Sequence, residues 1–157
     1  MNKHINKFII LFFLLLHGCG YKPILVSKNF NFSIGEIEAI GNKKINSELT
    51  NKIKLSKNKE NKNLVYNIKL DTIQKKNIVS KDQAGDPNEF EMFVATKFEV
   101  TNKNAEVLIN RLIQRKTNYK NNSDKFELKR YEDLIINTLT DSILDEIFSI
   151  LSSLNDS

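Results

Sequence analysis

In two stretches of the chain, residues 64–71 and 90–100, every second side chain is apolar or threonine, and most of those between them are polar. Successive side chains of a β-strand point to opposite faces, so this spacing puts the every-second side chains of a stretch on one face. Each stretch is therefore predicted to be a strand with one face toward a core and the other toward water. Strands of this kind require a second layer of structure to cover their apolar faces.

Two further strands are predicted from weaker versions of the same pattern. Residues 30–34 alternate, and the phase slips around Gly35, which indicates a strand with a bulge or bend. Residues 107–119 place their apolar side chains mainly on one parity and follow a short polar turn at residues 102–104, which is typical of a long hairpin. Residues 80–88 contain the turn sequence Gly-Asp-Pro and are expected to form an exposed loop.

Helical spacing appears in two segments. In residues 43–57, Ile45, Leu49 and Ile53 lie four apart, with Ser47 available as a nearby cap. A long helix is predicted from about Lys125 to Leu154, with Asp124 as its cap and Glu127 placed to complete a capping box. Its expected apolar stripe consists of Leu128, Tyr131, Leu134, Ile135, Leu139, Ile143, Ile147, Phe148, Leu151 and Leu154.

The order strand, helix, strand, strand, strand, helix predicts an α+β fold. Four strands with one-sided patterning and two amphipathic helices are satisfied by a two-layer sandwich, in which both helices pack on one face of a mainly antiparallel four-stranded sheet. A chain of 157 residues with 40% apolar side chains has room for one such domain.

The N-terminus has the pattern of an export signal. Lys3 and Lys7 precede nine consecutive apolar residues, 8–16. As a helix these nine residues would rise only about 14 Å, which is too short for a permanent membrane span. A positive start, a short apolar centre and a small-residue end are typical of a secretory signal peptide.

The signal ends in Leu16-His17-Gly18-Cys19, which resembles the bacterial lipobox, although His17 stands where a small residue is usual. The resemblance predicts a signal peptide over residues 1–18 and a single domain over residues 19–157, with Cys19 carrying fatty-acyl chains such as palmitate. Two or more acyl chains hold a protein to a bilayer almost permanently. Gly20, rather than an aspartate, favours the outer membrane by the same resemblance.

Several functional classes are disfavoured by composition. Removing residues 1–18 lowers the formal net charge of +5 by two, to +3, and no concentrated basic stripe suggests nucleic acid as a partner. Both histidines, His4 and His17, lie in the removed segment, so the mature chain has neither an imidazole base nor a free thiol. We therefore expect no enzyme activity, no metal and no cofactor. The acidic residues near the turn, Asp82, Asp86, Glu89 and Glu91, match no metal-ligand spacing and are interpreted as loop solvation.

The mature start, Cys19-Gly20-Tyr21-Lys22-Pro23-Ile24-Leu25, is similar to that of the lipopolysaccharide-assembly lipoprotein family, LptE, in its alphaproteobacterial form. The amphipathic segment 139–147 resembles the closing helix of that family, whose fold is also a two-helix, four-stranded sandwich. The resemblance implies a non-enzymatic protein at the outer membrane, facing the periplasm. It implies a role in plugging and supporting a β-barrel partner, LptD, and in binding lipopolysaccharide during its assembly.

Basic side chains near the third and fourth strands are the candidate ligands for lipopolysaccharide phosphates. Arg111 and Arg115 lie four apart and therefore on one side of their strand, and Lys97 and Lys116 could add charge nearby. An ordinary solvated role is the alternative for each of them. Both arginines are expected on the same face of the strand as Ile109 and Ile113. Either that face is mixed, or the strand extends past the core. The alternative function is a generic scaffold lipoprotein that binds other envelope proteins or peptidoglycan.

Overall fold

The structure is a computed structural model that describes residues 32–56 and 64–154. The signal peptide, the lipobox and the lipidation of Cys19 lie outside the described residues and stay predictions. The elements are β1 (Ser33–Gly41), α2 (Lys43–Leu55), β2 (Val65–Lys81), β3 (Pro87–Thr101), β4 (Val107–Lys120) and α3 (Lys125–Ser153).

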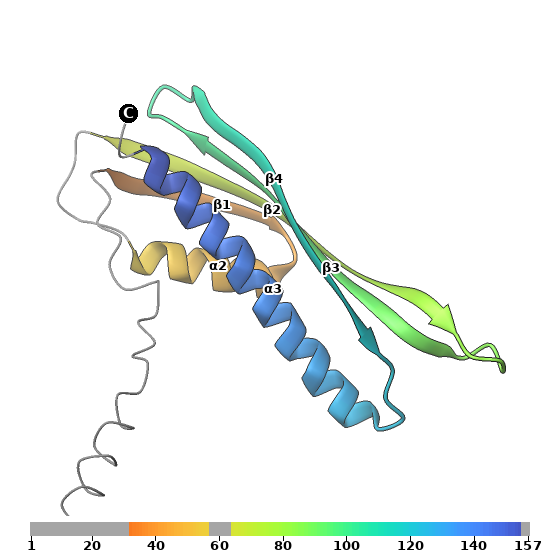
Figure 1. The fold of residues 1–157 in the computed structure, drawn as a ribbon. Helices are drawn as coiled ribbons and strands as arrows, with labels where there is room; N and C mark the ends of the chain where they lie inside the picture. The colour runs from red at the N-terminus through yellow and green to blue at the C-terminus, as the bar shows by residue number, and fades with distance from the viewer. Residues whose placement is uncertain (1–31, 57–63, 155–157) are drawn as a thin grey trace, which may run out of the picture.

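The four strands form one mixed sheet in the order β1-β2-β3-β4, with β1 and β4 at its edges. β1 pairs with β2 in parallel, whereas β2, β3 and β4 pair antiparallel. Both helices lie on the same face of the sheet and leave the other face open (Figure 1). A parallel pair needs a crossover, and α2 supplies it. The predicted α+β sandwich, with a mainly antiparallel four-stranded sheet, is confirmed.

The strands differ from the prediction chiefly in length. The expected bulge in β1 is confirmed, since the register with β2 shifts between Ile34 and Ile37. β2 continues ten residues beyond Asp71, because pairing with β3 sustains it even where its side chains no longer alternate. The loop is shorter than predicted, because the Asp82 carboxylate accepts the amides of Ala84 and Asp86 at 2.9 Å and tightens the turn.

The helix caps are partly as expected. α2 begins after Asn42, whose side-chain oxygen accepts the amide of Ile45 at 3.1 Å, so the cap is not Ser47, which is exposed inside the helix. At α3, Asp124 accepts the amides of Phe126 and Glu127 at 2.9 and 3.1 Å, as predicted. The expected return bond of the capping box is replaced, because the Glu127 carboxylate pairs with Arg130.

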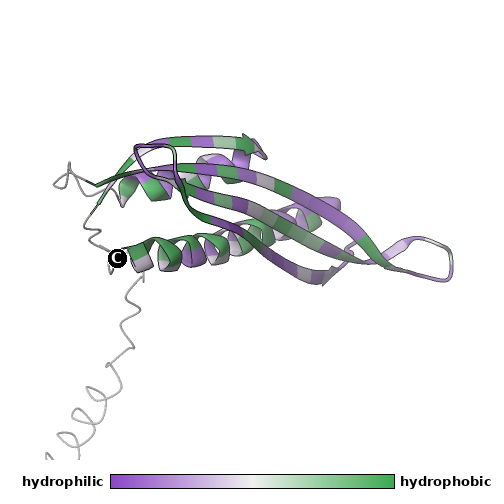
Figure 2. Ribbon diagram, turned by 90° about the horizontal axis from the view of Figure 1, so that it is seen from above, coloured by the Kyte–Doolittle hydropathy of each residue, from purple (hydrophilic) through white to green (hydrophobic). Residues whose placement is uncertain are grey.

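Alternating hydropathy is visible along the strands (Figure 2), but the core it builds is uneven along the sheet. We call residues 32–56, 64–73, 95–114 and 136–154 the proximal half, where four strands are covered by α2 and most of α3. The distal half comprises residues 74–94 and 115–135, where β2, β3 and β4 are covered by the first part of α3 alone. All but one of the largest fully buried side chains belong to the proximal half, and the exception is Met92.

The apolar stripe of α3 is only partly as predicted. In the distal half Tyr131 and Leu134 are 51% and 60% exposed, and in the proximal half Ile136 and Leu144, which the predicted stripe does not include, are buried. The start of α2 reaches α3 at Asp133, where Lys44 forms an ion pair with it. Before that point no described helix flanks α3. Leu134 directly follows Asp133, and its side chain is exposed although α2 is close by.

Candidate functional site

The four basic candidates do not form one cluster. In the register of β3 with β4, Arg111 is opposite Phe98 and Arg115 opposite Val94, both of which are buried under α3. The helix-covered face of β4, an edge strand, therefore carries both apolar side chains and arginines. Lys97 and Lys116 have the opposite parity and lie on the open face of the sheet, which is consistent with two surfaces rather than one site.

Arg115 joins β4 to α3. Its Nε donates to the Ser142 hydroxyl at 2.9 Å, and its Nη2 pairs with the Glu146 carboxylate at 2.5 Å. Its Nη1 donates to the backbone carbonyl of Gln114 at 2.9 Å, so the guanidinium wraps around the edge of the sheet. With three bonds inside the protein, Arg115 has less capacity left for a ligand than the sequence suggested.

Arg111 lies on the same helix-covered side of β4, four residues before Arg115, and its side chain has different surroundings. Its side chain is exposed, and it forms no hydrogen bond or ion pair with any residue that the structure describes. A guanidinium presents several donors in a fixed planar fork that suits carboxylate or phosphate. Of the two arginines, Arg111 is therefore the one available to an external anion.

The open face of the sheet has a shallow hollow at Lys116, with a volume of about 560 Å³. Phe93 lies between Lys75 and Lys116 in the cross-strand register. The Lys116 ammonium pairs with Glu91 at 2.9 Å, and this bond, helped by Asn77, holds the pKa of the Glu91 carboxyl below its usual value. The hollow is lined by Lys75, Asn77, Glu91, Phe93, Gln114, Arg115 and Lys116.

Lys97 lies in a separate and smaller hollow of about 170 Å³ on the same face. Lys69, Asp71 and Glu99 form the rest of its lining, so two cations face two carboxylates. This balance of charge makes the surroundings of Lys97 less attractive to a phosphate than those of Lys116.

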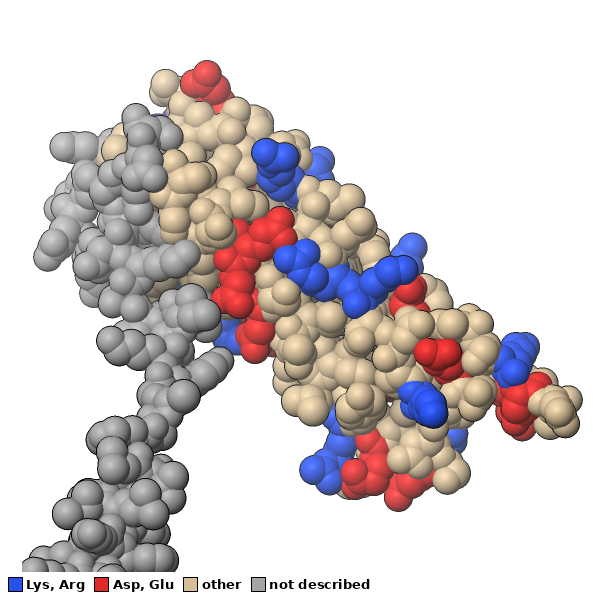
Figure 3. Space-filling view, viewed as in Figure 1, with Lys and Arg blue, Asp and Glu red and all other residues tan. Residues whose placement is uncertain are grey.

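The helix-covered face carries both signs of charge in close alternation (Figure 3). Ion pairs explain part of this pattern: Lys44 bonds Asp133 at 2.8 Å and Lys52 bonds Asp141 at 2.5 Å, which ties α2 to α3. Over residues 32–56 and 64–154, three or more potential metal ligands nowhere come together. Neither described helix has a stretch long and apolar enough to cross a bilayer.

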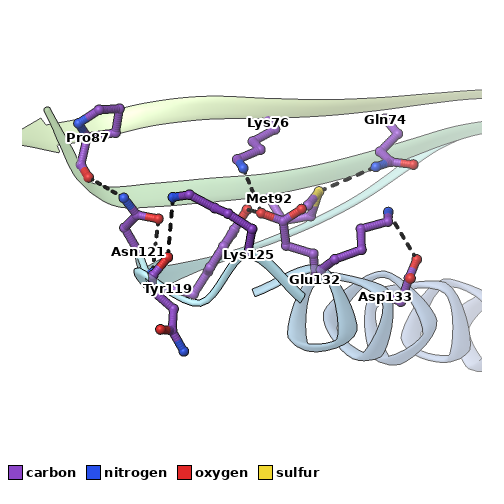
Figure 4. A network of polar contacts seen from close by, with 11 residues as sticks. Gln74, Lys76, Pro87, Met92, Tyr119, Asn121, Lys125, Glu132 and Asp133 are labelled. Carbon is purple, nitrogen blue, oxygen red and sulfur yellow. Dashed lines mark hydrogen bonds and ion pairs between the residues drawn. The ribbon is translucent and has the colours of Figure 1, made fainter. Parts of the chain in front are cut away.

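Glu132 of α3 forms a polar contact that sequence reasoning did not identify (Figure 4). Its carboxylate accepts from Lys76 of β2 at 2.6 Å and from the Tyr119 hydroxyl of β4 at 2.9 Å, with only 12% of the Glu132 side chain exposed. The Lys76 ammonium also lies 3.8 Å from the centre of the Phe90 ring. The signal in the sequence was a carboxylate within the apolar stripe of α3, between Leu128 and Ile135.

This contact changes the ionisation of Tyr119. Burial, followed by the hydrogen bond to Glu132, raises the pKa of the Tyr119 phenol well above its usual value. The phenol therefore remains a donor over the whole physiological range. One carboxylate thus bonds both outer strands of the distal half to α3, and we call the group Glu132, Lys76 and Tyr119 the distal clamp.

The chain shares its fold with solved structures of bacterial lipoproteins. Rare lipoprotein B from Shewanella oneidensis is similar, with a TM-score of 0.55 and 17% identity over 76% of this chain and 98% of that one. An uncharacterized lipoprotein B from Nitrosomonas europaea gives a TM-score of 0.56 and 20% identity, over 87% of this chain and 91% of its own.

A minor lipoprotein from Acinetobacter baumannii has a TM-score of 0.58 and 9% identity, over 80% of this chain and 94% of that chain. No family model matches the chain, and no curated protein matches it in sequence. The likeness extends over most of each chain at low identity, so it establishes that this protein has the two-layer fold found in these lipoproteins.

Proposed function

We propose that this chain is an outer-membrane lipoprotein of the LptE type, attached through acyl chains on Cys19 and facing the periplasm. In this role it plugs and supports a β-barrel translocon of the LptD type and binds lipopolysaccharide during assembly, without catalysing a reaction. The observation that carries the proposal is the fold shared with named lipoproteins over most of the chain. The lipobox and the Gly-Tyr-Lys-Pro start add independent support.

Attachment and barrel association are tested together in envelope fractions. The wild-type chain and Cys19→Ser, each with a C-terminal tag, are expressed in the native host and purified from detergent-solubilised membranes. We expect the wild type in the outer membrane with a large β-barrel protein in near-equal amounts, and Cys19→Ser with an uncut signal. Recovery of a lipidated protein with periplasmic proteins or peptidoglycan, and no barrel, would favour the scaffold function instead.

Lipopolysaccharide binding is assigned first to the open-face hollow at Lys116. An ammonium beside an aromatic ring suits a ligand that joins phosphates to acyl chains. Arg111 is the second candidate and Lys97 the third, while Arg115 serves mainly to hold α3. We expect Lys116→Glu to weaken binding of purified lipopolysaccharide by about fivefold to tenfold.

The matched control is Lys43→Glu, which makes the same change in charge at an exposed position of α2. Lys43→Glu should bind as the wild type does. Equal binding by Lys116→Glu and Lys43→Glu would remove the hollow from the site and leave Arg111 as the residue to test next.

A further inference from the structure

The outer edge of β4 presents backbone groups that the sheet does not use. The Asn121 amide bonds the Asn88 carbonyl at 2.9 Å, which fixes the phase of the β3–β4 ladder. In an antiparallel pair, residues that bond the neighbouring strand alternate with residues whose N–H and C=O point away. From Ile109 to Tyr119 the odd-numbered residues of β4 therefore bond β3, and the even-numbered ones, including Asn110 and Leu112, direct their amides and carbonyls outward. The register shifts at Leu108, so this alternation begins after that residue.

One contact supports this phase independently. The carbonyl of Gln114, an even-numbered residue, accepts a bond from its neighbour Arg115 at 2.9 Å, as an outward-facing carbonyl can. Arg115 thereby covers the edge at that point. Between this cover and the start of β4, the outward groups of Asn110 and Leu112 have no partner strand among the described elements.

The side chains around these groups favour an extended partner. Leu108 and Leu112 are 40% and 66% exposed on either side of the unpaired stretch. Natural edge strands usually avoid exposed apolar side chains beside unpaired backbone groups, because such an edge readily accepts another strand. Arg111 lies between the two leucines in the sequence, and its side chain is on the helix-covered face, opposite to that of Leu112. It has no bond to another described residue.

We propose that the edge of β4 from Leu108 to Leu112 binds an extended acidic segment of a partner protein by strand addition. The incoming strand completes the ladder through Asn110 and Leu112, places apolar side chains against the two leucines and sets a carboxylate against Arg111. β4 contains two arginines and two lysines and no acidic residue, so its positive charge favours a negatively charged partner strand. This inference requires neither lipopolysaccharide nor a barrel, so it goes beyond the proposed function.

A second copy of the chain fits the edge less well. Pairing β4 with β4 would bring like charges together across the new ladder, which is unfavourable. The other edge strand, β1, is acidic, but its bulge between Ile34 and Ile37 interrupts the row of outward groups. Its Glu38 carboxylate is also occupied by Lys69. An acidic segment from another protein is the occupant that these contacts favour.

The test uses the full chain in mild detergent and synthetic peptides of about nine residues, long enough for one strand. The first peptide has valine at alternate positions and a central glutamate between them; the second has lysine in place of the glutamate. A third repeats the first with N-methyl groups on the amides that would face β4. We expect the glutamate peptide to bind at least about fivefold more tightly than the lysine peptide, and the N-methylated peptide not to bind.

Two variants place the binding on β4. Arg111→Glu should reverse the preference, whereas Lys43→Glu, with the same change in charge on α2, should leave it unchanged. Leu112→Pro removes an outward amide and should be tolerated at a sheet edge. It should nevertheless weaken binding of the glutamate peptide by about tenfold or more. Circular dichroism and the urea midpoint confirm that each variant folds.

Hydrogen exchange gives a readout that needs no variant, since the Leu112 amide should be protected only when the glutamate peptide is present. Equal binding of the glutamate and lysine peptides would overturn the proposal. So would unchanged binding to Leu112→Pro, or an unprotected Leu112 amide in the complex. Concentration-dependent dimers that Leu112→Pro abolishes would replace the acidic partner with a second copy.

Discussion

The proximal and distal halves of this molecule are held together by different forces. In the proximal half α2 and α3 bury aliphatic side chains such as Ile45, Leu49 and Leu144 completely against four strands. In the distal half α3 alone covers three strands, Leu134 stays exposed, and Glu132 bonds β2 and β4 to the helix. The difference teaches that a helix covering a sheet alone can combine a smaller apolar core, around Met92 and Val94, with a shielded carboxylate that bonds the strands.

The largest expected effect concerns apolar packing. Leu144→Ala should lower the free energy of unfolding by about 3 kcal/mol, because it removes a fully buried side chain and leaves a cavity. The distal control Leu134→Ala, on the same helix and 60% exposed, should cost less than about 0.5 kcal/mol. Urea unfolding measures both values. Similar losses at the two positions would show that the halves are not packed differently.

A smaller effect is expected at two glycines with positive φ, one in each half. Gly41 has φ +94°, and a Cβ there would overlap the Thr72 carbonyl oxygen, so Gly41→Ala should cost about 2 to 3 kcal/mol. Gly85 has φ +89° in open space, so Gly85→Ala should cost only about 1 kcal/mol. The two urea midpoints sharpen the comparison, and a larger loss at Gly85 would contradict it.

Next in size is the distal clamp. Glu132→Gln removes the charge that bonds Lys76 and should lower the free energy of unfolding by about 1 to 2 kcal/mol. Hydrogen exchange should speed up mainly in residues 125–135 and leave α2 unchanged. Glu127→Gln, which affects an exposed pair with Arg130, is the control and should change little. Uniformly faster exchange in both halves would show that the clamp does not act locally.

The smallest effect is a pH dependence at the boundary of the two halves. The Lys44 ammonium beside Asp133 holds the pKa of that carboxyl below its ordinary value of 3.8. A depressed pKa contributes stability above the unfolded pKa, and that contribution is lost as the pH falls through the folded value. Wild-type stability should therefore fall slightly more between pH 5 and about pH 3 than that of Asp133→Asn. Measuring urea unfolding of both proteins across this pH range tests the prediction. Parallel curves of unfolding free energy against pH would show that this ion pair does not contribute to the acid response.

Sequence reasoning predicted the proximal half better than the distal one, for a physical reason. In the proximal half the four-residue spacing of apolar side chains in α2 matches their burial against the sheet, so Ile45, Leu49 and Ile53 are predicted correctly. In the distal half the continuation of β2 depends on pairing with β3, and no side-chain alternation marks it. The exposure of Leu134 depends on which sides of α3 the sheet and α2 cover, which the spacing within α3 does not encode.

The candidate site was predicted only in part. Strand parity correctly placed Arg111 and Arg115 on one side, but their different states follow from Ser142 and Glu146, which lie far away in the sequence. The distal clamp joins residues 56 and 13 positions apart along the chain, so its partners could not be chosen from local spacing. The carboxylate in the apolar stripe was the one local sign that a partner was needed.

The unbroken pairing of β2 with β3 also sets a length. Strands of 17 and 15 residues rise by about 50 Å from end to end, well beyond the roughly 30 Å of a bilayer's hydrocarbon layer. Anything that touches the turn at Asp82 and the far end of the sheet at the same time must therefore be a large assembly rather than a single lipid. The length of the sheet therefore sets how far apart two partners must lie if each contacts one of its ends.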